Sequence, residues 1–397
     1  MALMMSQTNT VNRRNFISIL GLGLGAVALS STISGCGEAT PQVDFGWNGP
    51  GAGITDIRLK VLSYAILCPN PHNKQPWIIK LNGELSFDLY VDPERLLPET
   101  DPFYRQIHIG QGTFLETLAI AATGLGYRAD IKYFPAGMYG NTELSNKPVA
   151  SISLSSDATV QPDPLFKQLL TRHSNKREYQ KQPLTLGELN SLEDFHQPDA
   201  VSKLTLLDSH RDLKKLEQVL TQAMKIEVGD RARDLETIKM FRFNAKELTT
   251  YRDGFGVAQA GVTGIKKILV ENLLLNRESV EKDPTDFGTE AVNMTQKTAA
   301  STATFGWLTT AGNSRLDQVL VGREYCRINL QTTAMGLAQH PMSQVLQEYP
   351  AMLALQQEYK SFFNIPNEET VQMLFRLGHA EATIHGPRRA LKNLIKI

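Results

Sequence analysis

The spacing of apolar residues changes along the chain and predicts where helices and strands lie. Residues 55–66 repeat apolar side chains with a helical period, and Thr55 is suited to cap the N-terminus of that helix. The face to be buried holds Ile57, Val61, Leu62, Ala65 and Ile66. Pro69 and Pro71 end the helix, because proline lacks the amide hydrogen that a helix needs.

The next segment alternates apolar and polar residues, which is the period of a strand. Residues 77–81 and 85–91 are predicted as two antiparallel strands with Asn82-Gly83 between them. Asn-Gly favours a two-residue type I′ turn, because both central residues of that turn need positive φ. The pattern therefore predicts a β-hairpin.

The rest of the chain carries both periods, which predicts an α+β fold. Residues 110–125, rich in Ala and Leu, are expected to form a central buried helix. Gln161-Pro162-Asp163-Pro164 has the composition of a linker, so a boundary is expected there. Further helices are expected to begin near residue 165 and to cover residues 213–249, 316–337 and 343–363. Further strands are expected at residues 131–134, 149–154, 203–207 and 370–377.

A weak internal repeat links two of the predicted helices. At an offset of 212 residues, which brings Gly124 onto Gly336, five small or apolar residues match. The matches join Gly110, Leu118, Ala122, Gly124 and Leu125 to Gly322, Leu330, Ala334, Gly336 and Leu337. The repeat suggests two related halves, each unable to complete a site alone, and coincidence between two packed helices is the alternative.

The first residues have the layout of an export signal. Arg13 and Arg14 precede residues 17–33, an apolar stretch diluted by glycine and alanine. Asn12-Arg13-Arg14-Asn15-Phe16-Ile17 resembles a twin-arginine signal, and the alternative is a chance basic pair before a buried helix. The twin-arginine export machinery would carry a folded protein to the periplasm or cell envelope, often with its cofactor already bound.

The segment that follows resembles a bacterial lipobox. In Ile33-Ser34-Gly35-Cys36, the cysteine would be lipidated and its acyl chains would hold the protein at a membrane surface. Residues 1–36 are therefore predicted as a signal peptide with a lipobox. Residues 37–54 are predicted as a tether, because residues 37–50 are rich in glycine and proline and have no periodicity.

Composition excludes several classes of protein. The 397 residues hold 41 Lys and Arg against 41 Asp and Glu, so no basic excess points to a nucleic-acid partner. With 42% hydrophobic residues the chain is suited to a globular fold. Its three cysteines cannot form a disulfide framework, so a buried core must stabilise it.

The usual motifs of metal and nucleophile sites do not occur in the sequence. The chain has no His-Glu-x-x-His, no Gly-x-Ser-x-Gly, no Walker loop and no paired Cys-x-x-Cys. Its histidines are scattered, so no metal site is expected. An organic cofactor is the better expectation.

One polar cluster lies between the first predicted helix and the hairpin. In the segment Cys68-Pro-Asn-Pro-His-Asn-Lys-Gln-Pro-Trp77, three prolines would fix an extended backbone. The amides of Asn70, Asn73 and Gln75 would then suit the edge of a flat polar heterocycle. The alternative is a rigid turn between two elements.

A second polar cluster spans residues 172–179, Arg-His-Ser-Asn-Lys-Arg-Glu-Tyr. Arg172, Lys176 and Arg177 bring three cations within six positions, and Ser174 adds a hydroxyl. Arginine offers a fork of donors and lysine a point charge, so the cluster suits a phosphate. Taken alone, it could equally be a solvated basic turn.

Together the clusters resemble the signatures of the flavin-dependent nitroreductase family. Residues 69–77 resemble its Pro-Ser-x-x-Asn-x-Gln-Pro-Trp motif, and Arg172-His173-Ser174-x-Lys176 resembles its Arg-x-Ser motif. The order of the motifs is reversed, which resembles the Acg-like branch, with two nitroreductase-like halves in one chain. The resemblance covers most of residues 55–389 and includes Asp92-Pro93-Glu94-Arg95, Arg252-Asp253-Gly254 and residues 372–378.

The resemblance implies a nitroreductase-like α/β/α sandwich with two pseudo-symmetric halves, residues 55–160 and 161–397, and one FMN site. The residues implied at the phosphate are Arg172, His173, Ser174, Lys176, Arg388 and Arg389. The residues implied at the flavin ring are Pro69, Asn70, Pro71, Asn73 and, less directly, Gln75. Residues 231–256 are a candidate lid, with a solvated helix as the alternative.

The implied function is electron transfer through N5 of the flavin, from a small-molecule donor to a small acceptor such as a nitroaromatic or a quinone. No side chain need act as acid or base, and a monomer would suffice because the halves mimic a dimer. One alternative is a protein that sequesters flavin without turnover, since an exported enzyme has little access to NAD(P)H. Another is a cofactor-free interaction protein on the same fold.

Overall fold

The computed structural model describes residues 46–196, 200–262, 267, 270–271 and 276–396. The predicted signal peptide, the lipobox with Cys36 and the first part of the predicted tether lie outside the described residues. In the described part, no helix combines the length and the apolar character needed to cross a membrane.

The first sheet is built almost entirely from the N-terminal half of the chain. Its order is β11-β1-β2-β4-β3, and all neighbours are antiparallel except the pair β11 and β1. The C-terminal strand of the chain thus lies in the first sheet, beside the first strand. The strands are β1 Trp77–Asn82, β2 Ser86–Val91, β3 Tyr127–Tyr133, β4 Ala150–Ser156 and β11 Ile395–Lys396.

The second sheet repeats the topology of the first. Its order is β5-β8-β10-β9, with antiparallel neighbours, so its strands in chain order occupy the same places as β1-β2-β4-β3. A long helix follows the second strand of each set: α3 Arg105–Gly124 and α11 Arg315–Ala334. The predicted α+β class with two pseudo-symmetric halves is confirmed. The strands are β5 Ser202–Leu207, β8 Thr304–Thr310, β9 Ala338–Pro341 and β10 Thr370–Gly378.

The two long helices pack against each other at a pair of glycines. A Cβ atom at Gly112 would lie 1.9 Å from the carbonyl oxygen of Val319, and one at Gly322 would lie 2.1 Å from that of Ile109. These reciprocal contacts relate the helices by an offset of 210, the distance from Gly112 to Gly322. The predicted offset of 212 was therefore wrong by two residues, because it aligned small residues rather than the crossing point.

Two buried arginines reinforce the same relation between the halves. Arg105, the first residue of α3, donates to the carbonyl oxygens of Leu346 at 2.5 Å and Gln372 at 3.0 Å. Arg315, the first residue of α11, donates to those of Gly140 at 3.2 Å and Glu143 at 2.6 Å. Each arginine thus satisfies carbonyl groups of the other half, which a buried guanidinium requires.

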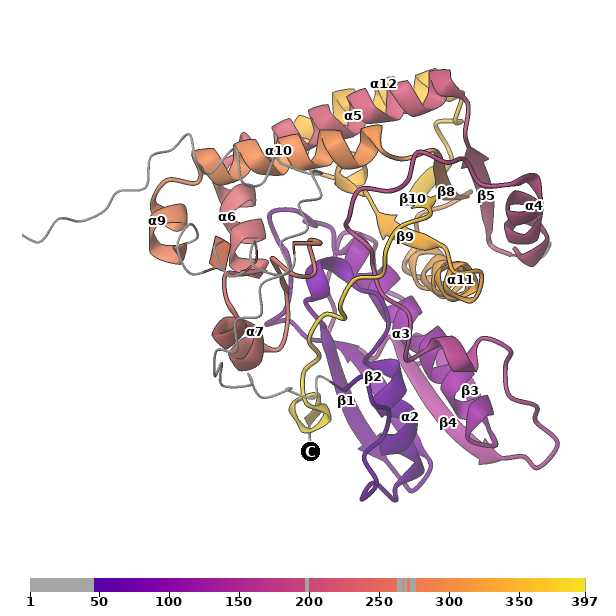
Figure 1. Cartoon of the computed structure of the whole chain (residues 1–397). Helices are drawn as coiled ribbons and strands as arrows, with labels where there is room; N and C mark the ends of the chain where they lie inside the picture. Colours follow the sequence, from indigo (N-terminus) through magenta and orange to yellow (C-terminus); the bar gives the residue numbers. More distant parts are fainter. Residues whose placement is uncertain (1–45, 197–199, 263–266, 268–269, 272–275, 397) are drawn as a thin grey trace, which may run out of the picture.

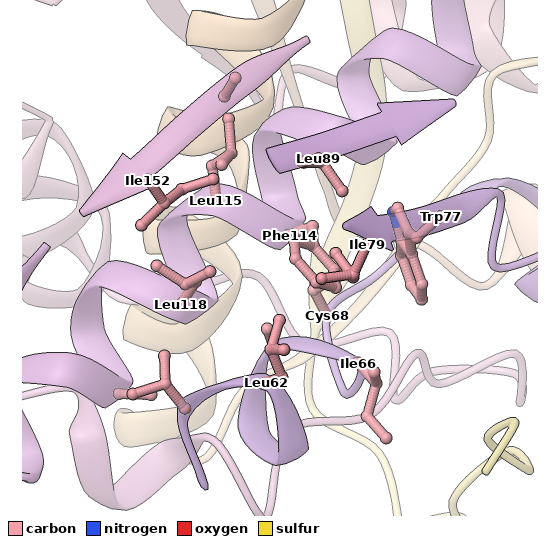
Figure 2. Close-up of a cluster of buried hydrophobic side chains, with 14 of the residues drawn as sticks. Leu62, Ile66, Cys68, Trp77, Ile79, Leu89, Phe114, Leu115, Leu118 and Ile152 are labelled. Carbon is pink, nitrogen blue, oxygen red and sulfur yellow. The ribbon is translucent and has the colours of Figure 1, made fainter. Parts of the chain in front are cut away.

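The largest core cluster lies between the first sheet and these helices. Figure 2 shows Trp77, Ile79 and Leu89 of the hairpin facing Phe114 and Leu118 of α3. The same cluster includes Val319, Cys326 and Leu330 of α11, so both halves share one core. Burial of each large apolar side chain contributes roughly 1.5–3 kcal/mol, before the entropy of ordering is subtracted.

A helical insertion separates β5 from β8. Figure 1 shows α5 and α10 side by side, with α12, far from the first sheet. At the related place in the first half, only residues 83–85 join β1 to β2. The insertion holds α5 His210–Val228, α6 Arg231–Met240, β6 Phe241–Arg242, α7 Ala245–Tyr251, β7 Phe255–Gly256, α9 Arg277–Lys282 and α10 Thr285–Ala300.

Most predicted elements are present, with shifts at their ends. The first helix, α2, spans Ile57–Ala65, and its N-cap is Asp56, whose carboxylate accepts from the amide of Arg58, rather than Thr55. The predicted helix over residues 213–249 is divided among α5, α6 and α7. The helices α4 Leu186–Phe195 and α10 and the strands β8 and β9 were not predicted.

Three local predictions were wrong. The hairpin turn has three residues, because Asn82 pairs with Ser86, so it is not a two-residue type I′ turn. The helix expected near residue 165 is only a 3₁₀ turn over Phe166–Gln168, since the chain then turns away to bring Arg172 inward. The helix expected from residue 343 begins at Leu353, because the backbone at Gln347 is extended and Pro350 lacks an amide hydrogen.

Candidate functional site

A cavity of about 400 Å³ lies where the two halves, the helical insertion and the C-terminal arm, residues 379–394, meet. That volume is in the usual range for a small-molecule site. The sequence-predicted residues that line it are Pro69, Asn70, Pro71, Asn73, Arg172, His173, Ser174, Lys176 and Arg388. Two separate sequence clusters and the C-terminal arm are thus brought together. Gln75 and Arg389 do not line the cavity.

Arg172 and Arg388 meet at the C-terminal end of helix α2. Arg388 donates from Nε to the carbonyl oxygen of Ile66 at 2.7 Å and from Nη2 to that of Leu67 at 3.1 Å. Arg172 also donates to the Leu67 carbonyl, at 3.1 Å, and to Oδ1 of Asn329. These bonds use the carbonyl groups that a helix leaves free at its end, where cations are favoured.

The two arginines form a buried positive site. Both are at least 95% buried, and within the described part of the chain neither forms an ion pair with a carboxylate. Burial and the charge of Arg172 lower the pKa of Arg388 to about 9. Nε of Arg172 has no hydrogen-bond partner among the described groups. Buried charges are normally paired, so this site favours an anionic ligand.

Trp47 supplies an aromatic floor that the sequence did not predict. Its ring lies 4.9 Å from the guanidinium of Arg388 and 5.8 Å from that of Arg172. It also stacks on His385 at 4.0 Å, and Nε1 donates to the carbonyl oxygen of Gly386 at 2.8 Å. The C-terminal part of the predicted tether is therefore packed against the site. The signal was a lone tryptophan in a glycine-rich segment.

Lys176 lies beside a histidine rather than a carboxylate. Its Nζ is 3.2 Å from Nε2 of His340, and Nε of Arg376 is 3.2 Å from Nδ1 of the same ring. Burial and Arg376 lower the pKa of Lys176 to about 8, and burial lowers that of His340 well below its ordinary value. His340 also lines the cavity and was not predicted from the sequence.

His173 and Ser174 line the same cavity. Nδ1 of His173 lies 3.1 Å from the carbonyl oxygen of Thr171, and burial lowers the pKa of the ring. The hydroxyl of Ser174 lines the cavity and bonds to no protein group in the described ranges. Ser174 can therefore offer its hydroxyl to a ligand beside Arg172.

The amides of the first cluster are used inside the protein. Oδ1 of Asn70 accepts from the amide of Gln75 at 2.8 Å. Asn73 donates to the carbonyl oxygens of Gly254 and Pro387, and its Oδ1 accepts from Arg388. The loop uses these amides to satisfy its own backbone and its neighbours, and their contact with a heterocycle stays a prediction.

Gln75 acts in the same way and is fully buried. It donates from Nε2 to the carbonyl oxygen of Arg252 at 2.8 Å, and its Oε1 accepts from the amide of Arg389. His72, Asn73 and Gln75 all have φ between 48° and 55°, a left-handed backbone that is costly for side-chain-bearing residues. The amide network offsets that cost and holds the loop in shape.

The loop thus presents another group to the cavity. His72 lines the cavity, and its Nδ1 is buried without a hydrogen-bond partner among the described atoms. Burial, Lys176 and Lys74 lower the pKa of His72 to about 4, so the ring is neutral at physiological pH. Pro69 and Pro71 of the same loop also line the cavity.

A network of ion pairs supports the site from behind. Asp253 pairs with Arg242 and, at 2.8 Å, with Arg95, whose Nη1 also donates to the carbonyl oxygen of Lys74. Arg389 lies 3.5 Å from Asp92 and donates to the carbonyl oxygen of Gln75. Arg389, which was expected at the phosphate, therefore braces the loop from outside the cavity, whereas Arg388 lines it.

Both described cysteines are buried and unpaired. Burial raises the pKa of Cys68 and of Cys326 to about 12, so both thiols are protonated at physiological pH. Cys326 packs in α11, with its sulfur 3.3 Å from Oγ1 of Thr117. Among the described residues, no group of three His, Cys, Asp or Glu is arranged to hold a metal.

Sequence comparison finds similar proteins in Mycobacterium tuberculosis. Two strains carry relatives named provisionally as NAD(P)H nitroreductases, each 24% identical to this chain over 349 residues. The match covers 85% of this chain and 90% of each relative. No family model matches the chain.

Structure comparison points to proteins with related names. A provisionally described nitroreductase from Anabaena variabilis aligns with 75% of this chain and 69% of its own, at 13% identity and a TM-score of 0.42. An FMN-dependent nitroreductase from Mycobacterium smegmatis, solved with NADPH, aligns with 58% and 96%, at 13% identity and a TM-score of 0.36. Over most of its length, this chain is therefore similar in sequence to proteins named as NAD(P)H nitroreductases.

Proposed function

We propose that this protein is an FMN-dependent oxidoreductase of the nitroreductase type. The observation that carries the proposal is the buried positive site of Arg172 and Arg388, which has no carboxylate partner in the described part of the chain and opens on a small-molecule cavity. Arg172 and His72 both line this cavity, and each has a buried nitrogen without a partner among the described atoms, which fits a ligand with a phosphate and a polar heterocycle. The motif order and the similarity to NAD(P)H nitroreductases support the same choice.

The residues of the cavity divide into two groups in this proposal. Arg172, Arg388, Lys176 and Ser174 bind the phosphate of FMN, because charge-assisted bonds to a buried anion are strong. Pro69, Pro71 and His72 lie against the ring, and the amide network of their loop fixes its shape. Bound FMN supplies the electron-transfer chemistry.

The donor and the acceptor would use the same cavity in turn. The similarity to proteins named for NAD(P)H supports a reduced nicotinamide as the donor. A small nitroaromatic or quinone-like acceptor suits the mostly apolar wall that the insertion adds. The oxidised donor would have to leave before the acceptor binds, so we expect ping-pong kinetics.

The visible spectrum of the purified protein tests the proposal directly. Protein from the cytosol of an export-blocked host should show a flavin band that bleaches with NADPH or NADH and recovers with a nitroaromatic. A colourless protein that takes up no added FMN would contradict the flavin site and favour a cofactor-free interaction protein.

The double variant Arg172→Ala and Lys176→Ala tests the phosphate assignment. Each charge-assisted bond contributes about 1.5–3 kcal/mol, so the variant should bind FMN at least about a hundredfold more weakly. The matched control is Arg128→Ala with Lys203→Ala, which removes the same charges from exposed positions. Equal FMN dissociation constants for the two double variants would refute the assignment.

Flavin sequestration remains a second candidate, because one observation favours it. Residues 252–256 of the insertion are held against the loop of the cavity: Asn73 bonds twice to Gly254, and Asp253 pairs with Arg95. A wall fixed in this way would restrict access of a second substrate. A flavin band that neither bleaches with NADPH or NADH nor responds to a nitroaromatic would support sequestration.

Export and lipid anchoring are proposed from the sequence alone. Twin-arginine export to the periplasm or cell envelope, with Cys36 lipidated, would hold the protein at a membrane surface. Acyl labelling of the wild type and of Cys36→Ser in a twin-arginine-competent bacterium tests both steps. Label on the wild type alone, in an exported fraction, supports the proposal, and an unlabelled cytosolic wild type contradicts it.

A further inference from the structure

Trp47 joins two parts of the chain that lie far apart in the sequence, beside the buried positive site. Its Nε1 donates to the carbonyl oxygen of Gly386 at 2.8 Å, although 339 positions separate the two residues. Its ring is stacked on that of His385, with 4.0 Å between the ring centroids and 11° between the planes. Trp47 and Gly386 both line the cavity. The indole is therefore held in a defined position at the ligand site.

The backbone before Trp47 is suited to this position. Gly46 has a φ of 90°, a conformation that residues with side chains rarely adopt. A Cβ atom at Gly46 would lie 3.6 Å from Cδ1 of Ile66 and 3.8 Å from Cβ of Arg388. The end of the predicted tether therefore runs in close contact with the residues that carry the positive site.

The indole lies beside two cations that repel each other. Burial and the charge of Arg172 lower the pKa of Arg388 to about 9, which indicates that the two charges are close together. The ring of Trp47 has both guanidinium groups within 6 Å, at 4.9 Å for Arg388 and 5.8 Å for Arg172. An aromatic ring attracts cations through its quadrupole but carries no net charge. Trp47 can therefore hold the pair together and leave both charges available to an anion, which a carboxylate would not do.

The other contacts of the two arginines are neutral as well. Both guanidinium groups donate to the carbonyl oxygen of Leu67 at 3.1 Å. Arg172 also donates to Oδ1 of Asn329, and Arg388 donates to Oδ1 of Asn73. Among the described residues, no carboxylate lies within ion-pair distance of either arginine. The pair is thus held by dipoles and by the indole, and its positive charge is not neutralised.

We propose that Trp47 is a positioning residue for the anionic group of the ligand. It holds Arg172 and Arg388 together as a preassembled pair, so that a phosphate binds without first having to bring two like charges together. The proposal rests on the proposed function, because it takes the phosphate of FMN as the group that binds. A ligand without a phosphate would gain nothing from this arrangement.

The affinities for FMN and for riboflavin test this role, because the two flavins differ only in the phosphate. Their dissociation constants are measured on the full chain by the quenching of flavin fluorescence. Trp47→Ala should weaken FMN binding about tenfold, since two cation–π contacts are lost, and should change riboflavin binding by about twofold or less. Trp47→Phe keeps an aromatic ring but loses the bond to Gly386, so it should weaken FMN binding by about threefold or less.

A control and a second probe separate this proposal from the proposed function. Phe103→Ala removes a 39% exposed aromatic ring that does not line the cavity, so both affinities should stay as in the wild type. An unchanged FMN affinity in Trp47→Ala overturns the proposal, and so do equal losses for FMN and riboflavin, which would indicate a general role in the fold. If the wild type binds neither flavin, the proposed function fails, and calorimetry with inorganic pyrophosphate still tests Trp47. Weaker pyrophosphate binding by Trp47→Ala than by the wild type supports the positioning role, and equal or absent binding overturns it.

Discussion

At the scale of single residues, burial and the charge of Arg376 set the pKa of Lys176, which lies beside His340. Arg376 is always protonated and donates to Nδ1 of His340, so the neutral imidazole carries its proton on Nε2. That proton faces Nζ of Lys176 at 3.2 Å. Lys176 thus lies against an imidazole instead of a carboxylate, and burial and the charge of Arg376 lower its pKa to about 8. An anion in the cavity would favour the charged form instead.

The affinity for FMN should therefore depend on pH. Below about pH 8 Lys176 is already charged and can bind the phosphate at no cost, whereas at higher pH binding must take up a proton. We expect the FMN dissociation constant to rise as the pH increases above about 8, and titrations between about pH 7 and pH 10 measure it. Lys176→Arg should flatten this dependence, because arginine stays charged. An identical pH dependence in wild type and variant would contradict the assignment of Lys176 to the phosphate.

Residue types alone revealed which clusters belong to the site, but not what each side chain does there. A phosphate-like composition at residues 172–176 was enough to find the cations. The bonds of Asn73 and Gln75 could not be predicted, since their partners come from Gly254, Pro387 and Arg389 far along the chain. Trp47 and His340 carried no pattern at all.

At the scale of elements, the crossing of α3 and α11 is the closest contact between the halves. The helices approach most closely at Gly112 and Gly322, where the Cβ atom of any other residue would clash with a backbone carbonyl oxygen of the other helix. Helices with glycine at the crossing can pack backbone to backbone. This contact positions the N-terminal part of α3, which lines the cavity. Gly110, in that end, lies against Pro71 of the loop.

Gly112→Ala should destabilise the whole fold. Its Cβ would lie 1.9 Å from the carbonyl oxygen of Val319, so the helices must move apart, at a cost of at least about 1–3 kcal/mol. Urea unfolding followed by circular dichroism measures the change. Gly187→Ala in α4 is the control, because the nearest atom to its Cβ is 4.0 Å away and alanine favours a helix. Equal midpoints for both variants would contradict the close packing.

Asp253→Ala should loosen the insertion from the loop of the cavity. It leaves Arg242 without its carboxylate and Arg95 with only Asp92 at 3.8 Å, and breaking a buried ion pair costs about 3–5 kcal/mol. We expect faster hydrogen exchange at the amide of Gly254, which bonds to the carbonyl oxygen of Asn73 at 3.2 Å. Asp130→Ala, at an exposed position of β3, should leave that exchange rate unchanged. An unchanged rate in Asp253→Ala would show that the ion pairs do not hold the insertion against the loop.

Periodicity predicted those elements whose burial is one-sided. The hairpin and α3 were found because their apolar residues recur at a strand or helix period. Strand β8 was missed because it is buried along its whole length and reads Thr-Phe-Gly-Trp-Leu-Thr-Thr, with no alternation. Helix α10 was missed because its buried face is made largely of Gly, Glu and Thr, which a hydrophobic pattern does not register.

At the scale of the whole molecule, the two halves cannot be separated without exposing the core. The main cluster takes residues from both α3 and α11, and strand β11 returns to pair with β1. The C-terminal arm that carries Arg388 is thereby held at both ends. We expect a protein that is folded as a monomer, because the interface between its halves is already internal.

Unfolding should therefore be a single cooperative transition. Trp77 reports the first half and Trp307 the second, and both are buried. Replacing the other two tryptophans by phenylalanine in turn gives two single-tryptophan chains, whose urea midpoints by fluorescence should coincide. Size-exclusion chromatography with light scattering checks the monomer. Midpoints that clearly separate would show that the halves unfold independently.

The insertion of residues 208–303 exists on one side only, and that asymmetry has a consequence for how the protein can vary. In an assembly of two identical chains, every substitution is made twice, once on each side of the axis. Here a change in α5, α6 or α10 occurs once, and the short turn of residues 83–85 at the related place is unaffected. Residues of the insertion that line the cavity can therefore change while the crossing of α3 and α11 stays the same. Substrate selectivity can thus change without altering the contact between the two halves.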